Sequence, residues 1–376
     1  MAALVLSRAG KSVLVLEKAT FPRSKVCGYS LNPRCWPIWE KYGLTDEFNQ
    51  LPHFDIAGFT LEKEGRPILR HPFQGHKTRT VERGVLDQWL AQEAQKSGAR
   101  FEFGVTVKNI SEGRVVTSSG DFHAPIIIGA DGRNSVVGRM SKLARPPGPC
   151  GRIGWQTFVD MPSLGDHVYM NVFPEGYYGL NRIDEKRTNI TIVLFSHAKV
   201  RPEEIMRKYL PEASYEAWKS VHPISRRPWE LTDGQSWLVG DAARILEPLT
   251  GEGIYSALAT AEMAAVNILS IGNVGTAAAA ENYRRQHRRL YGSRTLINSM
   301  VRWALEDSAR STRIMNFLSL CPALVGHMVE WVQSPAKARF SLQHDLQVPP
   351  KTPNRPPFLR NHSQNNTRLI IEAGVD

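Results

Sequence analysis

A carboxylate and three glycines stand at short spacing around residue 245, where together they could bind a hydroxyl-rich ligand. The apolar run Trp237–Val239 predicts a short buried strand that ends at Gly240 and Asp241. An ionised aspartate only accepts hydrogen bonds, so Asp241 suits the hydroxyl groups of a polyol. Gly251 and Gly253 follow where a helix begins, and without side chains they let the helix N–H groups approach a ligand. This order predicts a ligand-binding turn.

A second turn with a carboxylate lies upstream. The continuous apolar run Ile126–Ile128 predicts a strand that is buried on both faces, as in parallel sheets. It leads into Asp131 and Gly132, after which a helix is predicted. Ser135 can cap this helix, and Arg139 can reach a phosphate group. The segment therefore predicts a second contact with a ligand at the end of a parallel strand.

The amino-terminal segment predicts a helix over residues 1–10 and a buried strand over residues 11–17. In dinucleotide-binding folds, an acidic residue such as Glu17 binds ribose hydroxyls and follows the glycine-rich phosphate loop by about 20 residues. Counting back from Glu17 places that G-x-G-x-x-G loop just before Met1, and the sequence does not contain it. We therefore expect the sheet to lack its usual first strand and phosphate loop, which would weaken cofactor binding.

Together these segments resemble the FAD-binding motifs of the geranylgeranyl reductase and flavoprotein monooxygenase (para-hydroxybenzoate hydroxylase-like) superfamily. The resemblance covers most of residues 1–270 and implies an α/β, two-layer α+β fold. A Rossmann-like FAD-binding domain would carry an inserted antiparallel substrate sheet and C-terminal helices. The cofactor-binding residues that the resemblance implies are Glu17, Lys18, Arg23, Arg83, Asp131, Gly132, Gly240, Asp241, Pro248, Gly251, Gly253 and Ile254.

Two further segments help to choose a branch of this superfamily. Residues 21–28 resemble the Arg-x-Lys-x-Cys-Gly stretch of geranylgeranyl reductase-like enzymes, although Tyr29 stands where the family has a second glycine. Residues 173–181 resemble the segment that crosses above the isoalloxazine ring in these enzymes. The pocket residues that these segments suggest are Cys27, Gly28, Tyr177 and Tyr178.

The resemblance implies that NAD(P)H reduces FAD, which then either delivers hydride to a carbon–carbon double bond or activates dioxygen. Cys27, Gly28 and the apolar, aromatic strand Trp155–Val159 favour a reductase that acts on an apolar small molecule. An FAD-dependent hydroxylase is the alternative. The missing phosphate loop supports a third hypothesis, that the protein is a truncated and flavin-free binding or regulatory module. No cluster of residues predicts hydrolysis, phosphoryl transfer or a metal site.

The charge and the cysteine content indicate which partners and which cellular compartment to expect. The chain has 376 residues and a formal net charge of +11, which favours anionic ligands such as NADPH, nucleic acid or an acidic membrane surface. The basic run 283–290 lacks any nucleic-acid motif, so we interpret it as a solvated helix face and expect no nucleic acid partner. The four cysteines form no C-x-x-C pair, which fits a reduced compartment. We expect a cytoplasmic protein, with peripheral contact to a membrane as the alternative.

The motifs also predict the domain organisation. We expect the FAD-binding domain to comprise residues 1–53, 80–150 and 231–273, and the substrate sheet to comprise residues 54–79 and 151–230. Helices should follow over residues 274–346. The Pro- and Asn-rich segment 347–376 is predicted to be a disordered tail. The apolar segment 253–271 is interrupted by Glu262, so we expect a buried helix there.

Overall fold

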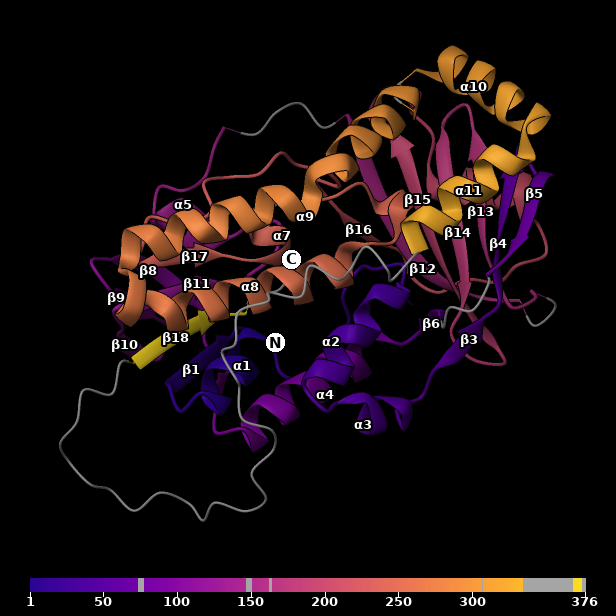
Figure 1. Cartoon of the computed structure of the whole chain (residues 1–376). Coiled ribbons are helices and arrows are strands. Elements are labelled where there is room, and N and C mark those ends of the chain that lie inside the picture. Colours follow the sequence, from indigo (N-terminus) through magenta and orange to yellow (C-terminus); the bar gives the residue numbers. More distant parts are fainter. Residues whose placement is uncertain (74–77, 147–150, 162–163, 306, 334–367, 374–376) are drawn as a thin grey trace.

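The fold, seen in a computed structural model, is built on two large sheets at opposite ends of the molecule (Figure 1). The structure describes residues 1–376 except 74–77, 147–150, 162–163, 306, 334–367 and 374–376. One sheet has five strands and the other has seven, and helices cover both. This mixture of strands and packed helices is the expected α/β class.

The five-stranded sheet is parallel throughout the pairs that define it. Its inner strands are apolar and mostly buried because other elements cover both faces, as parallel sheets require, whereas the edge strand is partly exposed. In order across the sheet, they are β17 (Ser236–Leu238), β11 (Ile126–Gly129), β18 (Arg368–Glu372), β1 (Ser12–Glu17) and β7 (Arg100–Phe103). Dinucleotide-binding sheets have the order 3-2-1-4-5-6, so β18 takes the place of their first strand.

Strand β18 corrects two expectations from the sequence. The central position of the sheet is filled, although the strand that fills it comes from the C-terminal end of the chain. Ala130 donates to the carbonyl oxygen of Glu372 at 2.8 Å, and Ala373 donates to that of Leu16 at 2.9 Å. The prediction of a disordered tail over residues 347–376 is therefore wrong for β18, while residues 347–367 and 374–376 lie outside the described residues. The physical reason is that β1 and β11 each present an edge whose backbone groups need partners.

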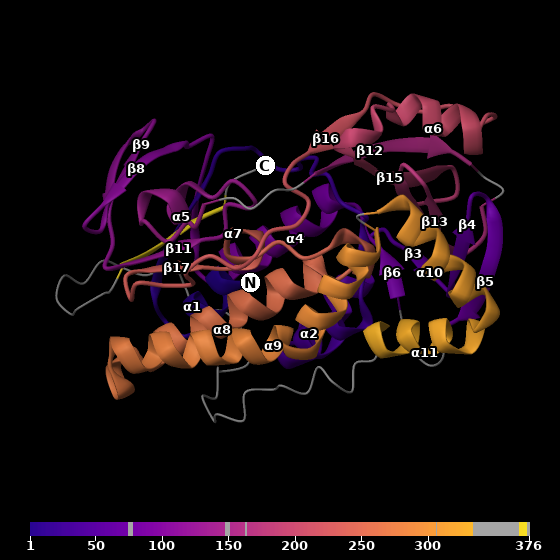
Figure 2. The ribbon, with the colours of Figure 1, turned by 90° about the horizontal axis from the view of Figure 1, so that it is seen from above.

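Helices and a small sheet cover the five-stranded sheet. In Figure 2, α1 (Ala2–Arg8), α8 (Gly253–Val274) and α9 (Thr276–Leu305) lie on one side of it, and α5 (Val136–Met140) lies on the other. Helix α8 is long and apolar enough to cross a membrane by length and composition, but 67% of its most apolar window is buried inside the protein. It packs against α1 and α9, as expected for a buried core helix.

The seven-stranded sheet is antiparallel except where β13 pairs with β4. Its order is β16 (Lys219–Val221), β12 (Arg152–Asp160), β15 (Arg187–Phe195), β14 (Gly176–Arg182), β13 (His167–Phe173), β4 (Gly58–Lys63) and β5 (Arg66–Pro72). Helix α6 (Pro202–Tyr209) packs on one face of this sheet. Helices α10 (Ser308–Leu320) and α11 (Pro322–Gln333) pack on the other face (Figure 2).

The five-stranded sheet and the seven-stranded sheet, each with its helices, form two lobes, and smaller elements complete the fold. The short strands β2 (Ser30–Leu31), β6 (Thr78–Thr80) and β3 (Phe54–Ile56) form one sheet, and β10 (Gly120–His123), β9 (Arg114–Thr117) and β8 (Val107–Ser111) form another. The remaining helices are η1 (Pro33–Cys35), α2 (Trp36–Lys41), α3 (Thr45–Asn49), α4 (Arg83–Lys96), η2 (Ser196–Ala198), α7 (Gly240–Ala243) and η3 (Pro248–Thr250).

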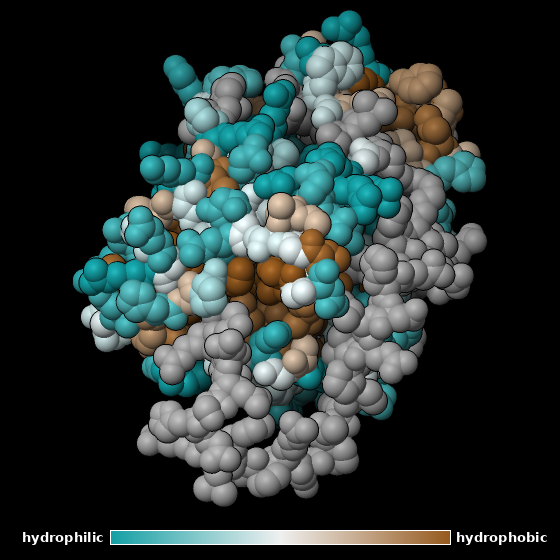
Figure 3. All heavy atoms as spheres, turned by 60° about the vertical axis from the view of Figure 1, so that its left-hand side comes forward, coloured by the Kyte–Doolittle hydropathy of each residue, from teal (hydrophilic) through white to brown (hydrophobic). Residues whose placement is uncertain are grey.

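The face shown in Figure 3 is polar over most of its area, with apolar side chains gathered at its centre and at its upper right. Large exposed apolar side chains occur on the last three helices, at Met300, Trp303, Phe317, Leu320, Leu324 and Met328. In the basic run, Arg288 pairs with the exposed Glu281 at 2.8 Å, as expected on a solvated helix face. Peripheral contact with a membrane stays a prediction.

Candidate functional site

A cavity of about 430 Å³ lies between the two lobes and is lined by residues of both sheets. Its size falls within the range of about 300–1,000 Å³ that is typical of ligand sites. Val15, Glu17 and Ile371 line it from the five-stranded sheet, and Trp155 and Met170 line it from the seven-stranded sheet. Ligands of open α/β sheets bind beyond the carboxyl ends of the strands, and this cavity lies at such an edge.

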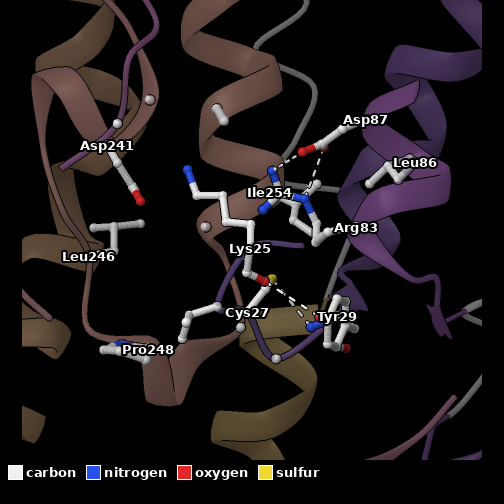
Figure 4. Close-up of a pocket in the computed structure, with 18 of the residues that line it drawn as sticks. Lys25, Cys27, Tyr29, Arg83, Leu86, Asp87, Asp241, Leu246, Pro248 and Ile254 are labelled. Atoms are coloured by element: carbon white, nitrogen blue, oxygen red, sulfur yellow. Dashed lines mark hydrogen bonds and ion pairs between the residues drawn. The ribbon is translucent and has the colours of Figure 1, made fainter. Parts of the chain in front are cut away.

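The turn at Asp241 is shaped so that its carboxylate faces the cavity. Gly240 has φ 56°, and a Cβ atom there would lie 3.2 Å from the side chain of Ala257, so this position favours glycine. Arg226 holds the turn by donating to the carbonyl oxygens of Asp241 at 2.7 Å and Ala242 at 2.9 Å. The Asp241 carboxylate is partly exposed in the cavity, 3.5 Å from Arg133. Figure 4 shows it across the cavity from Arg83 and Asp87.

The turn before α8 exposes backbone groups to the same cavity. Pro248 begins η3, and Gly251 follows with φ 63°, a conformation that favours glycine. A Cβ atom built at Gly251 or Gly253 would meet no atom within 4 Å, so both face open space. The first N–H groups of the 22-residue helix α8 are therefore accessible, and the positive end of its dipole favours a ligand with negative charge.

Glu17 provides an acceptor at the far end of the cavity. It is buried at the end of β1, where its Oε1 accepts from the N–H of Ala19 at 2.9 Å. Its Oε2 lies 3.7 Å from the Arg23 guanidinium and makes no hydrogen bond among the described residues. Burial raises the pKa of Glu17, while Ala19 and Arg23 oppose this shift. A carboxylate oxygen is thus ready to accept from hydroxyl groups of a ligand.

Arg83 lines the cavity but is already paired. Its guanidinium donates to both carboxylate oxygens of Asp87, at 2.9 and 2.8 Å (Figure 4). Arg23 lies 3.4 Å from the same carboxylate. Burial opposes ionisation, but Arg83 and then Arg23 hold the pKa of Asp87 below its ordinary value. The two arginines and Asp87 form one charged group on the cavity wall.

Asp131 contacts the start of α5. Its Oδ2 accepts from the N–H of Val137 at 3.0 Å, and with Ser135 it caps α5. It does not line the cavity, whereas its neighbour Gly132 does. Burial raises the pKa of Asp131. Burial, and then the carboxyl groups of Asp131 and Glu17, raise the pKa of the nearby Glu372 to about 9.

The structure brings most of the predicted site residues together. Those that line the cavity are Glu17, Arg23, Cys27, Gly28, Arg83, Gly132, Tyr177, Gly240, Asp241, Pro248, Gly251, Gly253 and Ile254. Lys18 is exposed and, like Asp131, does not line the cavity, so the structure does not place these two residues with the others. Tyr178 does not line it either: it packs against Phe173 and Tyr209 on the opposite face, because neighbouring strand residues point to opposite sides.

Sequence reasoning missed several residues of this site. Asp87, Arg133 and Glu247 line the cavity, and Arg152 pairs with Glu247. A signal for Glu247 existed, because it directly precedes Pro248 in the glycine-rich motif. Glu372 carried no signal, because it lies in a segment whose composition predicted disorder.

The wall on the seven-stranded sheet is mostly apolar. The side chains that form it are those of Phe59, Trp155, Val168, Met170, Tyr177, Val193 and Val221. Gly179 also lies in this wall, and a Cβ there would contact the side chains of Thr191 at 3.5 Å and Met170 at 3.7 Å. The cavity thus joins a polar end, near Glu17 and Asp241, to an apolar end.

Comparisons with known proteins agree with this geometry. Residues 1–159 match a family model described as an FAD binding domain. Menaquinone reductase from Mycobacterium tuberculosis is 29% identical over 301 residues, which are 70% of this chain and 72% of that protein. Digeranylgeranylglycerophospholipid reductase 2 from Methanopyrus kandleri is 28% identical over 293 residues, 70% of this chain and 72% of the relative.

A solved structure shows the same fold. The crystal structure of pqsL, a probable FAD-dependent monooxygenase from Pseudomonas aeruginosa, superposes with a TM-score of 0.68 at 17% sequence identity. The match covers 84% of this chain and 95% of that chain. At this identity the similarity concerns the fold alone.

Proposed function

Because the chain belongs to the superfamily of FAD-dependent oxidoreductases and monooxygenases, we propose that it is an NAD(P)H-dependent reductase of carbon–carbon double bonds in an apolar substrate. The observation that carries the proposal is the single cavity in which the Asp241 and Gly251 turns meet an apolar wall. Two similar proteins are named as reductases of menaquinone and of a digeranylgeranylglycerophospholipid. These names support a long apolar substrate.

The residues present fit FAD at both ends of the cavity. The buried Oε2 of Glu17, which makes no hydrogen bond among the described residues, suits the adenosine ribose. Asp241 suits the ribityl hydroxyls, and the start of α8 at Gly253 suits the polar edge of the isoalloxazine ring. Beside Glu17, Arg23 lies on the cavity wall and can face a phosphate group. Bound FAD would supply hydride transfer, while the chain binds and orients it.

The chain's own residues would also shape the reaction. Among the described residues, the part of the cavity wall on the seven-stranded sheet is mostly apolar and includes no lysine or arginine that could bind an acidic substrate there. A small phenolic acid would need such a partner, and this favours a reductase over a hydroxylase. A flavin-free module is the remaining alternative, but it leaves the open glycines at positions 251 and 253 without a purpose.

A single-turnover experiment separates the reductase from the hydroxylase. We expect the protein with reduced FAD to reduce a carbon–carbon double bond of a polyprenyl probe under anaerobic conditions, because hydride transfer needs no oxygen. The product would gain two hydrogens by mass spectrometry. A product formed only in air, with label from heavy dioxygen, would instead establish a hydroxylase and leave the FAD assignment intact.

Cofactor binding can be tested separately. Replacing Asp241 by alanine removes a charged acceptor worth about 1.5–3 kcal/mol, so we expect FAD affinity to fall by roughly one to two orders of magnitude. Glu17→Ala should act in the same direction. Asp160→Ala, at an exposed site outside the cavity, is the control. Fluorescence titration measures the three affinities, and unchanged values for both site variants would reject these assignments.

A further inference from the structure

A buried ion pair joins the cofactor turn to the substrate sheet. Arg152, at the start of β12, donates to both carboxylate oxygens of Glu247, at 2.9 and 2.8 Å. The Tyr177 hydroxyl, on β14, donates to Oε1 of the same carboxylate at 2.8 Å. The side chains of Arg152 and Glu247 are only 4% and 1% exposed. Two donors on the seven-stranded sheet therefore meet one buried carboxylate of the other lobe.

The pair lies beside the place where the flavin would bind. Glu247 directly precedes Pro248, and both residues line the cavity together with Tyr177. At the other end of the same turn, Glu252 pairs with the buried Arg34 at 3.2 Å, and Arg34 lies over the ring of Tyr255. Buried ion pairs thus anchor the turn on both sides.

Anchoring alone does not require charge at this position. Removing two charges from water costs about as much as their attraction returns, and apolar residues of similar volume often hold a contact equally well. A carboxylate on the wall of a cofactor cavity, however, also acts on charge that develops in the cavity. In a buried site this action is strong because water screens it little.

We propose that Glu247 is a positioning residue whose negative charge, balanced by Arg152, sets the reduction potential of the bound flavin. This inference rests on the proposed function, because it needs FAD in the cavity. Without Arg152, the negative charge of Glu247 would disfavour the added negative charge of the reduced flavin. Without Glu247, the positive charge of Arg152 would favour the reduced flavin. Tyr177 also affects this charge, because its hydroxyl donates a hydrogen bond to Glu247 and stabilises the carboxylate.

The test measures the midpoint potential of the bound flavin in the wild type, in four test variants and in one control variant. Arg152→Met is expected to lower it and Glu247→Gln to raise it, each changing the preference for reduced over oxidised flavin by about tenfold. The double variant, Arg152→Met with Glu247→Gln, should return close to the wild-type potential. Tyr177→Phe should lower the potential by less. Tyr178→Phe is the matched control, because this neighbour faces away from the cavity, and it should cause no shift.

The sign of the shifts decides the result. A purely structural role would loosen the turn in either single variant, so both potentials would move in the same direction, and that outcome overturns the inference. If a single variant fails to fold, the double variant and Tyr177→Phe still test the inference. An unchanged potential in Tyr177→Phe together with a shifted potential in the double variant would also overturn the inference. Failure of the wild-type protein to bind FAD would instead reject the proposed function.

Discussion

Replacing Arg152 by methionine is expected to lower the free energy of unfolding by about 3–5 kcal/mol, because it leaves Glu247 as an unpaired buried charge. Both side chains are almost fully buried, and the two hydrogen bonds between them are short. Methionine keeps much of the apolar volume of the arginine stem, so loss of packing contributes little. The expected loss is a large fraction of the stability of an ordinary domain.

Urea unfolding of the wild type and three variants, one of them Arg152→Met, tests this expectation. The double variant, Arg152→Met with Glu247→Gln, should recover much of the loss, because neither buried charge is then left alone. Arg145→Met is the surface control: Arg145 pairs with Glu230, but both side chains are about half exposed, so its loss should cost less than about 1 kcal/mol. If Arg152→Met is no more destabilising than Arg145→Met, the ion pair with Glu247 is not the buried contact described above.

Local motifs explain why much of the site could be predicted from the sequence. Gly240, Asp241, Gly251 and Gly253 act through backbone geometry that is set within a few residues, so their order in the sequence is sufficient. The same holds for Glu17 at the end of an apolar strand. These residues do line one cavity.

The sequence alone does not show which side chains of the two lobes face each other across the cavity. Tyr177 and Tyr178 are neighbours on one strand, so alternation guarantees that they face opposite sides. Which of them faces the cavity depends on how the sheet packs against the other lobe, and only the structure shows that it is Tyr177. Arg152 and Glu247 are 95 residues apart in the sequence, and nothing local links them.

The central strand of the cofactor sheet was unpredictable for a different reason. Arg368–Glu372 is a short apolar run within a segment rich in polar residues and proline, which on composition alone predicts disorder. Its structure arises because β1 and β11 offer backbone partners on both sides and bury Leu369, Ile370 and Ile371 almost completely. Tertiary context therefore overrides the local signal.

Glu372, at the end of this strand, is expected to make the free energy of unfolding strongly dependent on pH. Burial, then Asp131 and Glu17, raise its pKa to about 9 from an ordinary value of 4.5, and Arg139 opposes the shift. Between these two pH values the folded protein keeps a proton that the unfolded chain has lost. Rising pH therefore favours unfolding, with a slope of up to about 1.36 kcal/mol per pH unit for one proton. The stability that Glu372 contributes is fully present below its ordinary pKa and is lost as the pH rises through 9.

Glu372→Gln should remove this dependence, because glutamine needs no proton to stay neutral. We expect the variant to unfold at a higher urea concentration than the wild type at pH 8, with a flatter decline between pH 6 and 9. Some slope should remain, since burial also raises the pKa of Asp131. Glu40→Gln, at an exposed site on α2, is the control and should follow the wild-type profile. Identical pH profiles for Glu372→Gln and the wild type would show that Glu372 holds no such proton, and that β18 does not bring its carboxyl group against Asp131.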